Sequence, residues 1–155
     1  MVGPISYDDL PSLRHAFLIR DPERVIASYA AKRVAVRPEH LGVERQVEFF
    51  EREADRLGHS PPVIDSADIL RDPAVMLGLL CHSLEIRWEP AMLTWERGIR
   101  ETDGIWASHW YDAVADSTGF GPPDTKPVEL DDDARRVADR CRPYYDRLAV
   151  HRIKP

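Results

Sequence analysis

The sequence predicts a single α/β domain, in which a parallel sheet is flanked by helices. Two short apolar runs, residues 13–19 and 61–65, alternate with longer segments of helical periodicity. Short buried strands that are joined by helical crossovers form parallel sheets. The chain has 155 residues, and domains commonly have about 100 to 150 residues. We therefore expect residues 1–155 to form one domain.

The first apolar run ends at a helix start. Residues 13–19 are followed by Arg-Asp-Pro, in which Asp21 is a favourable N-cap and Pro22 a favourable first helical residue. We expect this helix to run to about Lys32. Apolar residues recur at spacings of three and four over residues 43–57, which predicts an amphipathic helix that Gly58 terminates. The second run then supplies the second strand.

The second half of the chain repeats this capping chemistry. Residues 71–73 again read Arg-Asp-Pro, and the apolar residues after them lie on one helical face. All four tryptophans fall within residues 88–110, and a short helix is predicted over residues 106–117. Three aspartates at 131–133 open a final helix, whose predicted apolar stripe comprises Ala134, Val137, Ala138, Cys141, Tyr145 and Leu148.

Composition and charge exclude several classes of protein. The net charge of −6 and the isoelectric point near 5.5 argue against nucleic acid or anionic lipid as a partner, so any anion site has to be local. The longest apolar stretch, residues 74–81, is far shorter than the roughly 20 residues of a membrane span. Two cysteines without a CxxC pair give neither a zinc ribbon nor a disulfide framework, which favours the reducing cytoplasm. No pair of histidines or carboxylates has the spacing of a metal site.

Arg20 occupies the position at which parallel α/β sheets bind ligands, just beyond the carboxyl end of the first strand. If the helix begins at Pro22, Ser28 lies two turns along it and nearly in line with Asp21. The arginine and the serine hydroxyl can then hold one phosphate together. The residues leave an alternative open, in which Arg20 pairs with Asp21 or Asp68 and Ser28 only packs.

Several motifs, in order along the chain, resemble those of one enzyme family. Residues 17–22 (FLIRDP), with Ser28 eight positions after the arginine, resemble the 3′-phosphate-binding motif of the sulfotransferases. Residues 64–73 (IDSADILRDP) resemble the family's later strand and helix start, and residues 141–148 resemble its C-terminal helix. Residues 102–111 (TDGIWASHWY) are similar to a bacterial sulfotransferase-like subgroup.

The resemblance implies a P-loop NTPase-like fold and a specific cofactor, 3′-phosphoadenosine 5′-phosphosulfate or adenosine 3′,5′-bisphosphate. It assigns Arg20 and Ser28 to the 3′-phosphate. Arg97 and Gly98 correspond to the family's Arg-Lys-Gly element, which closes over the same phosphate, although the lysine is missing here. The implied partners are a nucleotide and a small-molecule acceptor.

The family's Gly/Ser/Thr-rich phosphosulfate loop has no counterpart before Leu13. In the family, this loop and the general base precede the arginine-bearing strand. We therefore expect the chain to correspond to the C-terminal part of the domain, lacking its N-terminal strand, loop and helix. His109 is the candidate for a replacement base, since a histidine pKa near neutrality suits proton removal. The alternative is that His109 packs against the neighbouring tryptophans.

Three functions remain open for such a chain. With the phosphosulfate loop supplied, its complete form transfers sulfate from the nucleotide donor to a hydroxyl or amine. The alternative is a non-catalytic remnant that binds nucleotide or a protein, and the third is a helical interaction domain without a ligand. An absent first strand leaves apolar surface uncovered, so self-association is expected. Pyridoxal phosphate chemistry is discounted, because the chain has only three lysines to form a Schiff base, and Lys126 and Lys154 lie in a loop and at the terminus.

Overall fold

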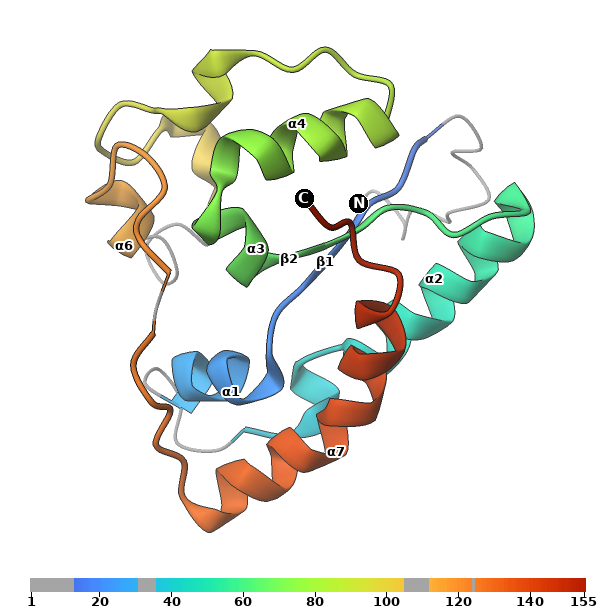
Figure 1. The fold of residues 1–155 in the computed structure, drawn as a ribbon. Helices are drawn as coiled ribbons and strands as arrows, with labels where there is room; N and C mark the ends of the chain where they lie inside the picture. The colour runs from blue at the N-terminus through green and yellow to red at the C-terminus, as the bar shows by residue number, and fades with distance from the viewer. Residues whose placement is uncertain (1–12, 31–35, 105–111, 124) are drawn as a thin grey trace, which may run out of the picture.

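The computed structural model of the protein describes residues 13–30, 36–104, 112–123 and 125–155 (Figure 1). Its strands, β1 (Phe17–Ile19) and β2 (Val63–Asp65), pair in parallel, with Phe17 opposite Val63 and Ile19 opposite Asp65. The predicted α/β fold with a parallel sheet is therefore confirmed. Both strands are shorter than the apolar runs that predicted them, because the ladder spans three residues on each side.

Helices lie on both sides of the sheet. In Figure 1, α3 and α4 lie on one side of the strands, and α1, α2 and α7 lie on the other. The described α-helices are α1 (Pro22–Ala30), α2 (Val43–Leu57), α3 (Ser66–Arg71), α4 (Pro73–Ser83), α6 (Asp112–Ala115) and α7 (Asp132–Ala149). The described 3₁₀-helices are η2 (Pro38–His40), η3 (Pro90–Leu93) and η4 (Glu101–Asp103).

The predicted capping residues start the helices. Asp21 Oδ1 accepts a hydrogen bond from the Glu23 amide at 2.9 Å, and Asp72 and Asp131 cap α4 and α7 in the same way. Gly58 ends α2 as predicted, with a left-handed φ of 72° that favours glycine.

Three differences from the sequence predictions stand out. Helix α3 was not predicted; it starts directly after β2, where Asp65 accepts a hydrogen bond from the Ala67 amide at 2.8 Å. The helix predicted over residues 106–117 is described only as α6, because residues 105–111 lie outside the described residues. Lys32, the expected end of the first helix, also lies outside them, and α1 is described to Ala30.

The core lies where α2 and α7 cover the sheet. Its buried members come from both strands and both helices, and α7 contributes the predicted stripe residues Ala138, Cys141 and Leu148. The central cluster consists of Phe17, Ile19, Val47, Phe50, Val63, Leu148 and Ala149. This packing fixes α7 across the sheet.

The two edges of the sheet differ. The C-terminal segment follows the outer edge of β2, where the Ile153 amide donates to the Val63 carbonyl at 2.8 Å. A groove of about 550 Å³ runs along β1, between α2 and α7, and Leu18 in it is 57% exposed. In the described part of the chain, no helix is both long and apolar enough to cross a membrane.

Candidate anion-binding site

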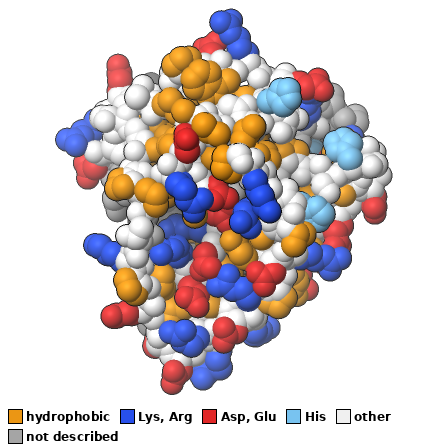
Figure 2. All heavy atoms as spheres, viewed as in Figure 1, with side chains coloured by type: hydrophobic (Ala, Val, Ile, Leu, Met, Phe, Trp, Pro, Cys, Tyr) orange, Lys and Arg blue, Asp and Glu red, His pale blue; other side chains and the backbone are white. Residues whose placement is uncertain are grey.

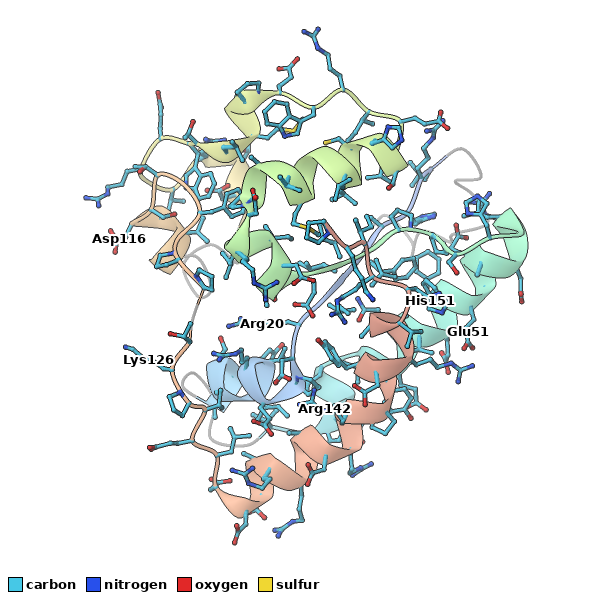
Figure 3. All side chains as sticks on the ribbon, viewed as in Figure 1. Arg20, Glu51, Asp116, Lys126, Arg142 and His151 are labelled. Atoms are coloured by element: carbon cyan, nitrogen blue, oxygen red, sulfur yellow. The ribbon has the colours of Figure 1, made fainter. Side chains whose placement is uncertain are left out.

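The carboxyl ends of β1 and β2 lie side by side, because the strands are parallel and Ile19 pairs with Asp65. Arg20 directly follows β1, and α1 begins two residues later at Pro22. Figure 3 shows Arg20 at this end of the strand, next to α1. The structure therefore places Arg20 at the sheet edge where parallel α/β folds bind ligands.

The Arg20 side chain is exposed, and among the described residues no hydrogen bond or ion pair engages it. Both acids that could have paired with it are engaged by other side chains. The Asp21 carboxylate accepts from Arg142 Nη1 at 2.8 Å. The Asp68 carboxylate lies 2.6 and 3.3 Å from the guanidinium nitrogens of two other arginines, Arg71 and Arg152. In the structure, these two carboxylates therefore pair with arginines other than Arg20.

Ser28 lies on α1 and is exposed, so its side chain is not a core packing group. Because the helix begins at Pro22 as predicted, the two-turn spacing between Asp21 and Ser28 holds in the structure. Joint binding of one phosphate by Arg20 and Ser28 stays a prediction.

Asp21 has two separate tasks at the start of α1. Its Oδ1 atom accepts from the backbone amides of Glu23 and Arg24 at 2.9 and 3.4 Å, while Oδ2 accepts from Arg142. Burial alone raises the pKa of Asp21, but the hydrogen bond and charge of Arg142, together with the two amides, outweigh it and lower the pKa. The carboxylate is therefore held in its charged form.

The end of β2 has the same construction. Asp65 is buried, its Oδ1 atom caps α3, and its Oδ2 atom accepts a hydrogen bond from the Tyr145 hydroxyl at 2.6 Å. Burial, followed by the hydrogen bond to Asp65, raises the pKa of Tyr145 well above its ordinary value. The phenol is therefore neutral and donates its proton to Asp65.

Helix α7 connects the two strand ends. The Arg142 guanidinium lies over the Tyr145 ring, 5.4 Å from its centroid, so one turn of α7 contacts both aspartates. From the sequence, Arg142 and Tyr145 are predicted only as members of the C-terminal helix. The sequence does carry one signal for them: an arginine and a tyrosine three positions apart on a helix, and an aspartate just before the helix that follows each strand.

Arg97 and Gly98 are held by another part of the molecule. Arg97 Nε donates to the Asp116 carbonyl at 3.1 Å, and the Gly98 amide donates to the Ala115 carbonyl at 2.9 Å. Figure 3 shows Asp116 well separated from Arg20. Among the described residues, no contact joins Arg97 or Gly98 to the Arg20 end of the sheet.

His109 lies outside the described residues. Within the described ranges, no group of three or more histidine, cysteine, aspartate or glutamate residues could hold a metal ion. Figure 2 shows basic and acidic side chains interspersed over this face, with hydrophobic side chains gathered over α4. On the face shown, an anion therefore meets individual arginines and no extended basic field.

A family model described as a sulfotransferase domain matches residues 1–151. The chain belongs to the sulfotransferase domain family. This membership confirms the family that the motifs indicated, and the mixed α/β fold with its parallel strands is consistent with it. In this sulfotransferase domain, the sequence FLIRDP forms β1 and the start of α1.

Two curated relatives from Arabidopsis thaliana also match this sulfotransferase domain. Branched-chain-amino-acid aminotransferase-like protein 2 is 33% identical over 138 residues, and branched-chain-amino-acid aminotransferase-like protein 1 is 33% identical over 141 residues. Each match covers 89% of this chain and 24% of the relative, so the chain spans about a quarter of the length of these proteins. No solved structure matches the chain.

Proposed function

We propose that this sulfotransferase domain binds 3′-phosphoadenosine 5′-phosphosulfate, with Arg20 and Ser28 on the 3′-phosphate. The observation that carries the proposal is the exposed Arg20 guanidinium at the carboxyl end of β1, while Asp21 and Asp68 are engaged by other arginines. A guanidinium supplies a planar, permanently charged fork that fits phosphate oxygens, and a serine hydroxyl adds a single donor.

In its complete form, such a domain transfers sulfate from the nucleotide to a hydroxyl or amine acceptor. The acceptor attacks the sulfur in line with the leaving phosphate, and positioned cationic and hydrogen-bonding groups stabilise the charge that develops. The part of Arg20 and Ser28 is to anchor the nucleotide. The exposed Arg97 is proposed to add a second cation over the same phosphate, which requires the segment that now contacts α6 to approach Arg20.

Isothermal titration calorimetry with adenosine 3′,5′-bisphosphate tests the nucleotide site. We expect Arg20→Ala to weaken binding of the bisphosphate by about ten- to hundredfold, because it removes a charged hydrogen-bond donor. Ser28→Ala removes a neutral donor and should weaken binding by less. Arg87→Ala is the matched control, because Arg87 is 88% exposed and contacts only Glu89 among the described residues. Equal affinity of the wild type and Arg20→Ala would remove the proposed role of Arg20.

A non-catalytic nucleotide-binding remnant is the second candidate, because Arg20 and Ser28 account for nucleotide binding but supply no general base. Transfer of labelled sulfate by the purified chain to a panel of hydroxyl and amine acceptors separates the two functions. Detectable transfer excludes the remnant. If His109 is the base, His109→Ala abolishes that transfer while nucleotide affinity is retained.

Self-association is a separate proposal, supported by the groove along β1 and the exposed Leu18 within it. Sedimentation velocity over a range of concentrations should show a species larger than the monomer. A charge on a strand edge opposes edge-to-edge pairing, so Leu18→Lys should shift the distribution towards the monomer. A wild-type chain that sediments as a monomer at every concentration contradicts the proposal.

A further inference from the structure

After each strand, an aspartate caps the helix that follows, and the two aspartates divide their oxygens in the same way. In Asp21, Oδ1 caps α1 and Oδ2 accepts from Arg142 at 2.8 Å. In Asp65, Oδ1 caps α3 and Oδ2 accepts from the Tyr145 hydroxyl at 2.6 Å. Helix capping uses only the Oδ1 atom of each aspartate, so it does not explain why Oδ2 of each contacts a side chain of α7.

Asp21 is the acid that can interfere most directly with an anion site at Arg20, because the two residues are adjacent in the chain. A carboxylate offers a guanidinium the same bidentate geometry as a phosphate, so an unengaged Asp21 would compete for Arg20. Its negative charge would also repel a phosphate bound close by.

Arg142 removes this competition in the structure. Its guanidinium occupies Asp21 Oδ2 and is itself stacked over the Tyr145 ring, whose hydroxyl is anchored to Asp65. The side chains of Arg142 and Asp21 are 35% and 37% exposed, so the pair lies at the surface end of the sheet, where a ligand can approach Arg20. Arg20 meanwhile has no partner among the described side chains.

We propose that Arg142 is a positioning residue of the anion site, which holds Asp21 away from Arg20 and so keeps the Arg20 guanidinium available for phosphate. The inference rests on the proposed function, since it assumes that Arg20 binds the 3′-phosphate. Asp21 carries a negative charge when it caps α1 in this way, and α7 neutralises that charge through Arg142. Arg142 itself acts through Asp21 and does not touch the nucleotide.

A double-mutant cycle tests this role by calorimetry with adenosine 3′,5′-bisphosphate. Arg142→Met keeps most of the side-chain length but frees Asp21, and should weaken binding by about tenfold. Asp21→Asn keeps the helix cap, because asparagine caps as well as aspartate, and should bind at least as tightly as the wild type. The double variant should return to within about threefold of the wild-type affinity, because no carboxylate is left to compete.

Further variants separate positioning from a general structural effect. Arg142→Lys keeps the charge next to Asp21 and should retain binding, while Arg136→Met, which removes another exposed arginine of α7, should leave binding unchanged. Circular dichroism and thermal melts check that each variant folds. If the double variant binds as weakly as Arg142→Met, then Arg142 does not act through Asp21 and the proposal is wrong.

The outcomes also distinguish this inference from the proposed function. If Arg20→Ala loses affinity but Arg142→Met binds as the wild type does, the nucleotide site stands and the positioning role fails. If the wild type does not bind the bisphosphate, or Arg20→Ala binds it equally well, both fail. If Arg20→Ala and Arg142→Met both lose affinity for the bisphosphate, and the double variant of Asp21 and Arg142 regains it, the nucleotide site and the positioning role are both supported.

Discussion

Arg20 and Arg142 contact the same end of the sheet, but their surroundings assign them different tasks. Arg20 is exposed and has no partner among the described residues, whereas Arg142 is held between Asp21 and the Tyr145 ring. The position of Arg20 was predictable, because a strand, a capping aspartate and a proline follow one another in the sequence. The role of Arg142 was not, because 121 positions separate it from Asp21.

Glu53 is a second residue whose environment only the structure reveals. Its side chain is buried in α2, where Oε2 lies 2.7 Å from His15 Nδ1 and 2.8 Å from Arg56 Nη2. The hydrogen bond from Arg56 lowers the pKa of Glu53 most, burial opposes this, and His15 lowers it further. His15 is 38 positions away from Glu53, so the local helix pattern did not single out this buried pair.

Glu53→Gln should destabilise the protein by about 1 to 2 kcal/mol, because it removes the charge from a buried cluster and leaves one amide group poorly matched to His15 and Arg56. Urea unfolding followed by circular dichroism measures the change. Glu48→Gln, at an exposed position of the same helix, should stay within about 0.5 kcal/mol of the wild type. Equal effects of the two substitutions would show that the Glu53 cluster adds nothing to stability.

At the scale of elements, helix starts and stops were the most predictable features. Helix α2 covers the predicted residues 43–57 and ends at Gly58, since its apolar spacing and its terminating glycine are both local signals. Helix α3 was missed because six residues are too few to show a period, and because its cap, Asp65, is also the last residue of β2. Elements that share a residue cannot be separated by periodicity alone.

Helix α7 depends on its cap. Asp131 Oδ1 accepts from the Ala134 amide at 2.8 Å, so Asp131→Ala should cost about 1 kcal/mol of stability, while Asp131→Asn should cost much less. Thermal melts of the three proteins measure the difference. Identical melting temperatures for Asp131→Ala and the wild type would mean that this hydrogen bond does not stabilise the helix.

At the scale of the whole molecule, the described residues form a thin, two-stranded sheet, and α7 contacts the aspartates at its carboxyl end. The family, the α/β class and the parallel pairing were predictable from motifs in their order along the chain. The groove along β1 and the pairing of the C-terminal segment with β2 were not, because both depend on how distant segments meet.

Acid should destabilise the folded protein. The folded-state pKa values of Asp21 and Glu53 lie below their ordinary values of 3.8 and 4.5, so the unfolded chain binds protons first as the pH falls. Their contribution to stability is therefore present above about pH 4.5 and is lost as the pH drops through the lowered values. Urea unfolding at pH 7, 4 and 3 should show this loss, and Glu53→Gln should reduce the slope. A free energy of unfolding that is constant down to pH 3 contradicts this account.

Arg20 is proposed to bind the 3′-phosphate of a nucleotide. The most direct test removes the 3′-phosphate from the ligand and the guanidinium from the protein in turn. It compares the affinities of the wild type and of Arg20→Ala for adenosine 3′,5′-bisphosphate and for adenosine 5′-monophosphate. We predict that the wild type prefers the bisphosphate by about tenfold or more and that Arg20→Ala loses this preference, because the arginine and the phosphate act as one pair. A preference for the bisphosphate that is equally large in Arg20→Ala would contradict the claim.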